Sequence, residues 1–345
     1  MEHYAGIDVS LGSSSVCVVE GTGKIVVEAK VASEPEALIG WLRGQRFELA
    51  RIGLEAGPLS QWLFAGLRDA GFAVELLETR HVRDAFKAMP VKTDKKDARG
   101  IAQLMRLGWF KPVHCKSVSA QETRALLTAR KLLQAKRHDV EMSLRGVLRG
   151  FGLKVGPTTP RTFESRVYEL VEGHPTLVTV AEALLAARTE LLRRFKELER
   201  RLVEIGRADE RVRRLTTVPG VGNLVALTFV AAIDDPSRFR SSRQVGAYLG
   251  LTPKRYQSGE TDVSGRISKI GDHGVRTMLY EAANVMLTRP VKGSALKDWA
   301  LAVAKRAGPR KAKVALARKL AVVLHAMLAK VTNFEHRREP VVAMA

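Results

Sequence analysis

The sequence predicts an α/β region at the N-terminus followed by an all-α remainder. Three stretches rich in β-branched residues open the chain, which is typical of strands. Helix-like and strand-like stretches then alternate up to residue 107. From residue 119 onward, leucines recur at the 3.6-residue spacing of amphipathic helices. This succession indicates a mixed sheet covered by helices, joined to mostly helical domains.

The first 107 residues contain the predicted sheet. Gly21-Thr22-Gly23 separates the second and third strands as a hairpin turn, so the first three strands form an antiparallel meander. A meander followed by alternating helices and strands is the order expected of a ribonuclease-H-like fold. The predicted strands are 3–9, 13–20, 24–31, 50–55 and 72–78, and the predicted helices are 34–46, 59–71, 80–89 and 94–107.

Gly108 and Pro112 mark a boundary before the helical remainder. Residues 119–150 and 177–206 predict an antiparallel helical pair or coiled coil, and we expect it to serve dimerisation. Basic residues on its outer face offer nucleic-acid contact as an alternative. The other predicted helices are 162–173, 238–250, 272–289 and 310–331, with a polar loop or ribbon at 251–270. The predicted domains are 1–110, 111–207 and 208–335, followed by a tail at 336–345.

The charge balance points to a polyanionic partner. Among 345 residues, 57 Lys and Arg face 36 Asp and Glu, a formal charge of +21, and the pI is about 10.3. Such a charge repels itself unless a polyanion offsets it, and nucleic acid is the leading candidate. The longest apolar run, 224–233, is too short to span a bilayer, and no secretory signal is visible. Two unpaired cysteines fit a reducing cytoplasm.

Four carboxylates stand out against this basic background. Asp8 and Glu55 each close an apolar, strand-like run, while Asp94 and Asp97 are three residues apart and share one face of a helix. If the two strands are adjacent and parallel, all four acids can meet. Two Mg²⁺ ions roughly 4 Å apart, or Mn²⁺, would neutralise them and act on a phosphodiester. The neighbouring Lys92, Lys95 and Lys96 are candidate phosphate contacts, or simply solvated.

A second motif, Pro219-Gly220-Val221-Gly222, separates two helices. Its glycines, Gly220 and Gly222, let backbone N–H groups approach phosphate at a helix N-terminus, as in a helix-hairpin-helix. The simpler interpretation is a Gly-rich interhelical turn.

A third segment places Ser258 in a Gly-flanked loop among many cations. Cations around a hydroxyl favour its attack on an anionic phosphodiester. A Ser-Gly pair is also a common turn, so the segment alone does not establish catalysis. The surrounding cations are Lys254, Arg255, Arg266, Lys269 and Arg276.

The three motifs, in this order, resemble the IS110-type transposases, which are serine-using DEDD recombinases of bacterial insertion sequences. The resemblance covers nearly the whole chain. Its N-terminal half resembles that family's RuvC-like domain, and its C-terminal half resembles the family's transposase domain. The matching motifs are Gly6-Ile7-Asp8-Val9-Ser10, Leu54-Glu55, Lys92-Thr93-Asp94-Lys95-Lys96-Asp97-Ala98, Pro219-Gly220-Val221-Gly222, Arg238-Phe239, Gly250-Leu251-Thr252-Pro253, Ser258-Gly259 and Ser268-Lys269-Ile270-Gly271.

The resemblance implies a metal-bound tetrad of Asp8, Glu55, Asp94 and Asp97, with Ser258 as nucleophile. It further implies a covalent protein–DNA intermediate that is re-ligated to a new strand. The protein would act on donor and target DNA as a homodimer or homotetramer. A structured guide RNA would pair with both DNAs. One departure concerns the serine: many relatives follow it with two glycines, whereas Glu260 follows Gly259 here. Ser264 and Ser268 are therefore the alternatives.

Three other functions remain open from the residues alone. A RuvC-like junction endonuclease would use the carboxylates with water and need no serine. A sugar-kinase or actin-like ATPase also opens with Gly-Ile-Asp, but a second Gly-rich phosphate loop and an adenosine loop are missing from the sequence. A noncatalytic DNA-binding protein would use the helix-hairpin-helix and leave the carboxylates incidental.

Overall fold

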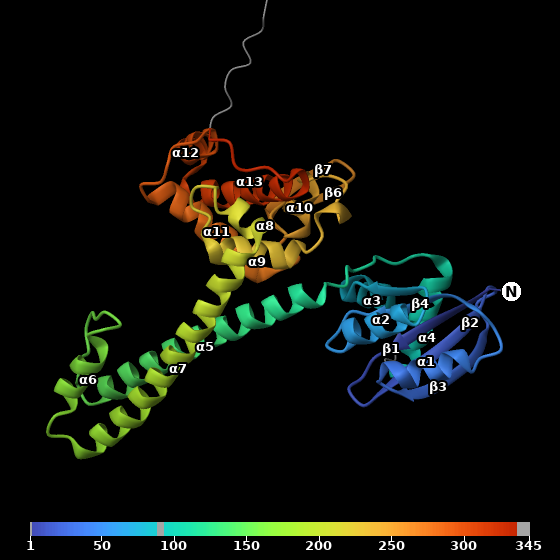
Figure 1. Ribbon diagram of the computed structural model, residues 1–345, viewed down its shortest axis with the longest axis horizontal. Helices are drawn as coiled ribbons and strands as arrows, with labels where there is room; N and C mark the ends of the chain where they lie inside the picture. The colour runs from blue at the N-terminus through green and yellow to red at the C-terminus, as the bar shows by residue number, and fades with distance from the viewer. Residues whose placement is uncertain (1, 88–92, 337–345) are drawn as a thin grey trace, which may run out of the picture. The chain divides into compact units, whose positions relative to one another are not determined.

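Figure 1 presents the computed structural model of the chain, which describes residues 2–87 and 93–336. The chain divides between Lys116 and Ser117 into two compact units. The predicted first boundary lies at residue 110, and the predicted division of the helical remainder at residue 207 stays a prediction. Among the described residues, no helix combines the length and the apolar character needed to cross a membrane.

The N-terminal unit contains a five-stranded mixed sheet with the order β3-β2-β1-β4-β5. The first three strands pair antiparallel, while β4 is parallel to β1 and β5 is parallel to β4. This confirms the predicted mixed sheet with its meander, and the arrangement fits a ribonuclease-H-like domain. The strands are β1 (His3–Asp8), β2 (Ser13–Glu20), β3 (Ile25–Ala32), β4 (Leu49–Glu55) and β5 (Val74–Leu77).

Helices cover both faces of this sheet. Because side chains alternate along a strand, Ala5 and Ile7 pack on one face with the helices α1 (Pro35–Arg43) and α2 (Ser60–Asp69). The other face meets α4 (Asp94–Leu107), which follows α3 (Thr79–Phe86). A Cβ added at Gly6 would lie 2.2 Å from the carbonyl oxygen of Ala98. The backbone of α4 is therefore in direct contact with β1, at a point where only glycine fits.

Two long helices open the C-terminal unit. Figure 1 shows α5 (Val118–Gly150) beside α7 (Pro175–Ala208), with the short α6 (Phe163–Val171) at one end of the pair. Arg188 is buried near that end, where its Nε donates to Oε1 of Glu141 at 2.8 Å. Leu144, Leu148 and Leu185 are buried within the chain, whereas Leu132 is exposed. Dimerisation through these helices stays a prediction.

The rest of the unit is a helical core. The helix α9 (Asn223–Ile233) is apolar on nearly every side, and its Phe229 and Ile233 are fully buried. The surrounding helices supply the remainder of this core. They are α8 (Glu210–Leu215), the 3₁₀ turn η1 (Pro236–Arg238), α10 (Arg243–Tyr248), α11 (His273–Thr288), α12 (Ala295–Ala307) and α13 (Pro309–Lys330).

One expectation about the helices in this core is wrong, and one helix was not predicted. The predicted helix 238–250 is instead η1 followed by the short α10, because the Asp235 carboxylate accepts from the Ser237 N–H and starts a separate turn. The helix that was not predicted is α12. Ser294 caps its start by accepting from the Lys297 N–H at 3.2 Å, but its alanine-rich sequence lacks the leucine spacing used to recognise helices.

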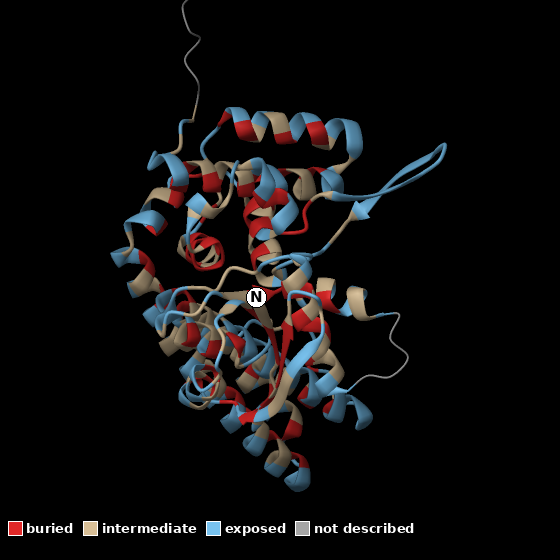
Figure 2. Ribbon diagram, turned by 90° about the vertical axis from the view of Figure 1, so that its right-hand side faces the viewer, coloured by how far each residue is buried: buried red, intermediate tan, exposed pale blue. Residues whose placement is uncertain are grey.

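The segment predicted as a loop or ribbon is a ribbon. It forms a hairpin of β6 (Pro253–Ser258) and β7 (Thr261–Ile267), paired antiparallel. Every residue of β6 is exposed, as is every residue of β7 before Ile267. Figure 2 shows this hairpin in the exposed colour, projecting from the helical core.

Candidate active site

Asp8 and Glu55 lie at the ends of neighbouring parallel strands. The register pairs Gly6 with Gly53 and Ile7 with Leu54, so Asp8 and Glu55 occupy the next step of the same ladder. A Cβ at either glycine would contact α4. Because the side-chain period of a strand is two, the side chains two residues later project to that same face. Both carboxylates are half-buried at the edge of the sheet next to α4.

Asp94 and Asp97 lie in the first turn of α4. Thr93 starts this helix, and its hydroxyl accepts from the Lys96 N–H at 3.3 Å. Tyr4 packs near Leu104 and Met105, and Gly6 meets the middle of the helix, so Asp8 is directed towards the beginning of α4. All four acids therefore lie at one end of the same sheet face. Their negative charge at a helix N-terminus is also favoured by the helix dipole.

The four carboxylates are not close enough together to form a metal-binding group. Among the described residues, no group of three or more His, Cys, Asp or Glu is arranged so that it could hold a metal ion. Their chemistry nevertheless fits a hard divalent cation, because every donor in the set is a carboxylate oxygen.

Glu28 on β3 is a neighbouring acid that the sequence interpretation missed. It accepts from Nη2 of Arg99 and pairs with Nζ of Lys95, each at 2.9 Å. The hydrogen bonds from Arg99, reinforced by Lys95, lower the pKa of the Glu28 carboxyl to about 2. The only sequence signal was an acid on the sheet face that otherwise packs against α4.

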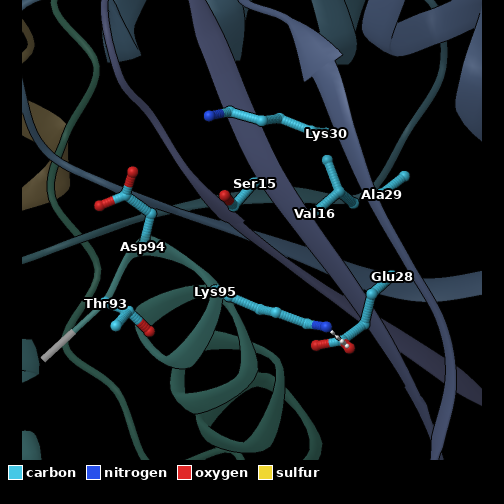
Figure 3. Close-up of a pocket in the computed structure, with 8 residues that line it drawn as sticks. All are labelled: Ser15, Val16, Glu28, Ala29, Lys30, Thr93, Asp94 and Lys95. Carbon is cyan, nitrogen blue, oxygen red and sulfur yellow. Dashed lines mark ion pairs between the residues drawn. The ribbon is translucent and has the colours of Figure 1, made fainter. Parts of the chain in front are cut away.

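An open pocket of about 650 Å³ adjoins this ion pair (Figure 3). Lys95 extends to Glu28 across the pocket, whereas the Asp94 carboxylate points away from that pair. Lys95, predicted to contact phosphate, is thus engaged within the protein. Lys96 is half-buried, and Lys92 lies outside the described residues.

Ser258 ends β6 at the tip of the exposed hairpin, opposite Thr261. The two-residue turn between them consists of Gly259 and Glu260. Gly259 has φ 55°, a conformation that favours glycine, whereas Glu260 is not among the residues with positive φ. One glycine therefore suffices for this turn, which accounts for the departure at Glu260. The serine hydroxyl is displayed on a narrow, solvent-exposed arm.

The cations predicted around Ser258 fall into two groups. Lys254, Arg266 and Lys269 are exposed. Arg255 is engaged across the hairpin, where its Nε donates to Oδ1 of Asp262 at 2.8 Å and holds the pKa of that carboxyl below its usual range. Arg276 donates to the carbonyls of Leu249, Ile270 and Gly271 at 2.9–3.1 Å, so it holds the base of the hairpin together.

The glycine motifs beside the hairpin have a structural explanation. A Cβ at Gly250 would lie 2.0 Å from the Ile270 carbonyl oxygen, and one at Gly271 would lie 2.2 Å from that of Tyr248. The segments that enter and leave the hairpin therefore cross with their backbones in contact. Ser264 lies on β7 and Ser268 at this crossing, so neither alternative serine is at the tip.

Gly220 and Gly222 lie between α8 and α9 as predicted. Gly220 has φ 82°, and a Cβ there would lie 2.8 Å from the Ala282 carbonyl oxygen, so its close packing on α11 alone requires glycine. Gly222 is the exposed residue that precedes α9, whose first N–H groups have no side-chain cap. This end of α9 can therefore donate to a phosphate.

Comparisons with known proteins cover both units. A sequence model described as a transposase of the IS116/IS110/IS902 family matches residues 212–313, and a DEDD-type IS110 transposase model matches residues 5–152. The chain is 30% identical to the transposase for insertion sequence element IS1111A of Coxiella burnetii, over 94% of this chain and 89% of that protein. It is also 30% identical to a probable family 20 transposase of Pseudomonas aeruginosa, over 82% and 85% of the two chains.

A solved structure of Thermus thermophilus RuvC in complex with Holliday junction substrate is also similar. It is 16% identical and covers 33% of this chain and 100% of its own, with a TM-score of 0.25. The full-length sequence relatives are the decisive finding, since they span both the carboxylate-bearing unit and the serine-bearing unit. The chain therefore belongs to the IS116/IS110/IS902 family of transposases, which are DNA recombination enzymes.

Proposed function

We propose that this transposase cuts and rejoins DNA with Ser258 as nucleophile and a metal-bound tetrad of Asp8, Glu55, Asp94 and Asp97. The observation that carries the proposal is the shared end of one sheet face. Adjacent parallel strands bring Asp8 and Glu55 there, and α4 begins there with the other two acids. Two Mg²⁺ ions, with Mn²⁺ as a substitute, would offset the carboxylate charge and stabilise the attacking and departing oxygens.

The proposed reaction exchanges one phosphodiester for another. The Ser258 hydroxyl loses its proton, its Oγ forms a bond to phosphorus, and the bond from phosphorus to one deoxyribose oxygen breaks. That deoxyribose oxygen takes up a proton, and the DNA remains joined to the protein. In the second step a deoxyribose hydroxyl of a new strand attacks the same phosphorus and releases Ser258. Because a P–O bond replaces a P–O bond each time, rejoining needs no external energy source.

The N–H groups near Gly222 and the exposed cations Lys254, Arg266 and Lys269 would hold donor and target DNA by their phosphates. Lys96 and Lys92 would serve the same purpose near the acids. Contacts of this kind fix position without reading sequence, so we propose that a guide RNA selects the sites. The charge of +21 favours a protein that carries two kinds of nucleic acid.

The decisive experiment is denaturing electrophoresis of the protein with labelled target DNA, guide RNA and Mg²⁺. We expect a protein–DNA band that survives denaturation, and we expect Ser258→Ala to abolish it. The matched control is Ser264→Ala, which removes an exposed hydroxyl from the other strand of the same hairpin and should leave the band intact. Asp8→Asn should abolish the band without unfolding the protein.

Two outcomes would redirect the assignment. If Ser264→Ala or Ser268→Ala removes the band while Ser258→Ala does not, the nucleophile is the serine whose replacement removes it. If Ser258→Ala still cuts DNA while Asp8→Asn does not, the protein is a RuvC-like endonuclease that uses water.

A further inference from the structure

An open groove of about 1040 Å³ lies beside the base of the β6–β7 hairpin, within the C-terminal unit. One wall comes from the hairpin, through Pro253 and the residues around Ile267. The other comes from α12 and α13, whose contributions include Trp299 and Val314. Neither helix belongs to the motifs singled out in the sequence, and of the residues that line the groove only Arg266 and Lys269 have been assigned above, to contact with DNA phosphates.

The groove is strongly cationic. Among the described residues that line it, none is acidic, and none of its cations forms an ion pair with a carboxylate. Elsewhere in the same unit such pairs are common, for example Arg124 with Asp272. Clustered positive charges without counter-charges repel one another and concentrate anions. The six cations are Arg266, Lys269, Arg310, Lys311, Arg318 and Lys319.

Two of these cations lie where helix stability disfavours them. Arg310 and Lys311 directly follow Pro309 in the first turn of α13, and no acid is present in that turn. The N-terminus of a helix carries partial positive charge, so cations there are disfavoured. A bound anion in the groove would offset this repulsion.

The floor of the groove is apolar. Val314 and Val322 line it along α13, and Trp299 faces it from α12, with Nζ of Lys319 lying 4.0 Å from the ring centroid. A surface that holds duplex DNA by its phosphates needs no apolar floor, because the bases of a duplex are stacked inside. An unpaired strand presents both base faces and phosphates, which match an apolar floor with a cationic rim.

We propose that this groove binds an unpaired DNA strand. Ser264 is the lining residue nearest the tip of the hairpin; it pairs with Arg255, and three residue steps separate Arg255 from Ser258. At about 3.3 Å per step, the groove ends roughly 10 Å from the serine hydroxyl. The groove is thus an anchor for a strand outside the reacting phosphate. The inference rests on the proposed function in taking a cut or exchanged DNA strand as the ligand.

Binding can be measured without cleavage, which separates this inference from the serine mechanism. Fluorescence anisotropy would compare a labelled 20-nucleotide oligothymidylate with an oligouridylate and a DNA duplex of equal length, in the full chain carrying Ser258→Ala. We expect Arg310→Gln/Lys311→Gln to weaken single-strand binding about tenfold and to lower the slope of log K against log salt by about 1.4. Duplex binding should change by less than about twofold.

The matched control removes the same charge from the same pair of helices. Lys305→Gln/Arg306→Gln alters two exposed cations in the last turn of α12 that do not line the groove, and single-strand affinity should change by less than about twofold. A floor variant, Val314→Thr/Val322→Thr, should weaken single-strand binding about threefold with an unchanged salt slope, because only apolar contact is lost. Unfolding temperatures would verify that each variant is folded.

Four results would overturn the proposal. Equal losses in the groove variant and the α12 control would show that only overall charge matters. Equal losses for duplex and single strand would make the groove a general phosphate-binding surface. A loss confined to oligouridylate would assign it to RNA, and no loss for any nucleic acid would assign it to another occupant, such as an acidic peptide.

Discussion

Glu28 connects β3 to the first two turns of α4 through Lys95 and Arg99. Asp94 and Asp97 lie in the same stretch of the helix, so the ion pair and the backbone contact at Gly6 together fix the rotation of α4. The direction in which Asp94 and Asp97 project therefore depends on the Glu28 carboxylate, which is not part of the proposed tetrad.

Replacement of Glu28 by Gln should reduce stability in a pH-dependent way. The lowered pKa of Glu28 means that its contribution is fully present above about pH 4.5 and is lost as pH falls towards 2. Since Lys95 and Arg99 are partly exposed, we expect a loss of about 1–2 kcal/mol at pH 7, well below the full value of the shift. Urea unfolding of both proteins should show this difference shrinking by more than half at pH 3.

The control for this measurement is Glu75→Gln, which alters a half-buried carboxylate on β5 of the same sheet. It should change the free energy of unfolding at pH 7 by less than about 0.5 kcal/mol. A Glu28→Gln difference that stays constant from pH 7 to pH 3 would contradict the role of charge.

At the scale of elements, the β6–β7 hairpin depends on its turn. Gly259→Ala places a Cβ on a residue with φ 55°, which costs about 1 kcal/mol. An isolated two-stranded hairpin is only marginally stable, so this cost should partly unfold the tip that carries Ser258. We expect the rate of covalent adduct formation to fall about fivefold while the unfolding temperature of the core is unchanged.

Gly265→Ala is the matched change on the same hairpin. Its Cβ would meet Lys254 at an ordinary contact distance of 3.7 Å, so the adduct should form at nearly the normal rate. Equal slowing by both substitutions would mean that the conformation of the turn does not matter.

The sequence predicted the sheet because each strand has a local signal. Val16, Val18 and the Gly21–Gly23 turn identify the meander, and Asp8 and Glu55 stand out because they end apolar runs. Helix α12 was missed because its packing is not visible in its own sequence. Small residues such as Ala300 are buried only because neighbouring helices lie against them. The four acids and Ser258 were singled out by local signals of the same kind, and their roles stay proposals. Glu28 and the groove arise from residues brought together by folding, which no spacing along the chain reveals.

At the scale of the whole molecule, the proposed acids and the proposed nucleophile belong to different compact units. The resemblance to the family implies that one subunit supplies the carboxylates and its partner supplies Ser258. A heterodimer made by co-expressing Asp8→Asn and Ser258→Ala chains with different tags should then regain about half of the strand-transfer activity, since one of its two composite sites is intact. Each variant alone should be inactive, and an inactive heterodimer would place both halves of the site in one chain.

The net charge of +21 bears on the guide RNA. We expect cutting at a defined target to require RNA transcribed from the noncoding end of the element. DNA binding without that RNA should persist and weaken steeply with salt, because it depends on phosphate contacts. Cutting at the same defined site by protein freed of RNA with a ribonuclease would contradict the proposed guidance.

The exposed arm that carries Ser258 has a practical consequence. Its peptide bonds are more accessible to a protease than those of the packed helices, so brief digestion should nick the chain there first. The two fragments would stay associated through the helical core on either side of the cut. A nicked preparation would have the native size and the spectrum of the intact protein and yet lack activity. Nicking should therefore be excluded on a denaturing gel before inactivity is attributed to an absent cofactor or partner.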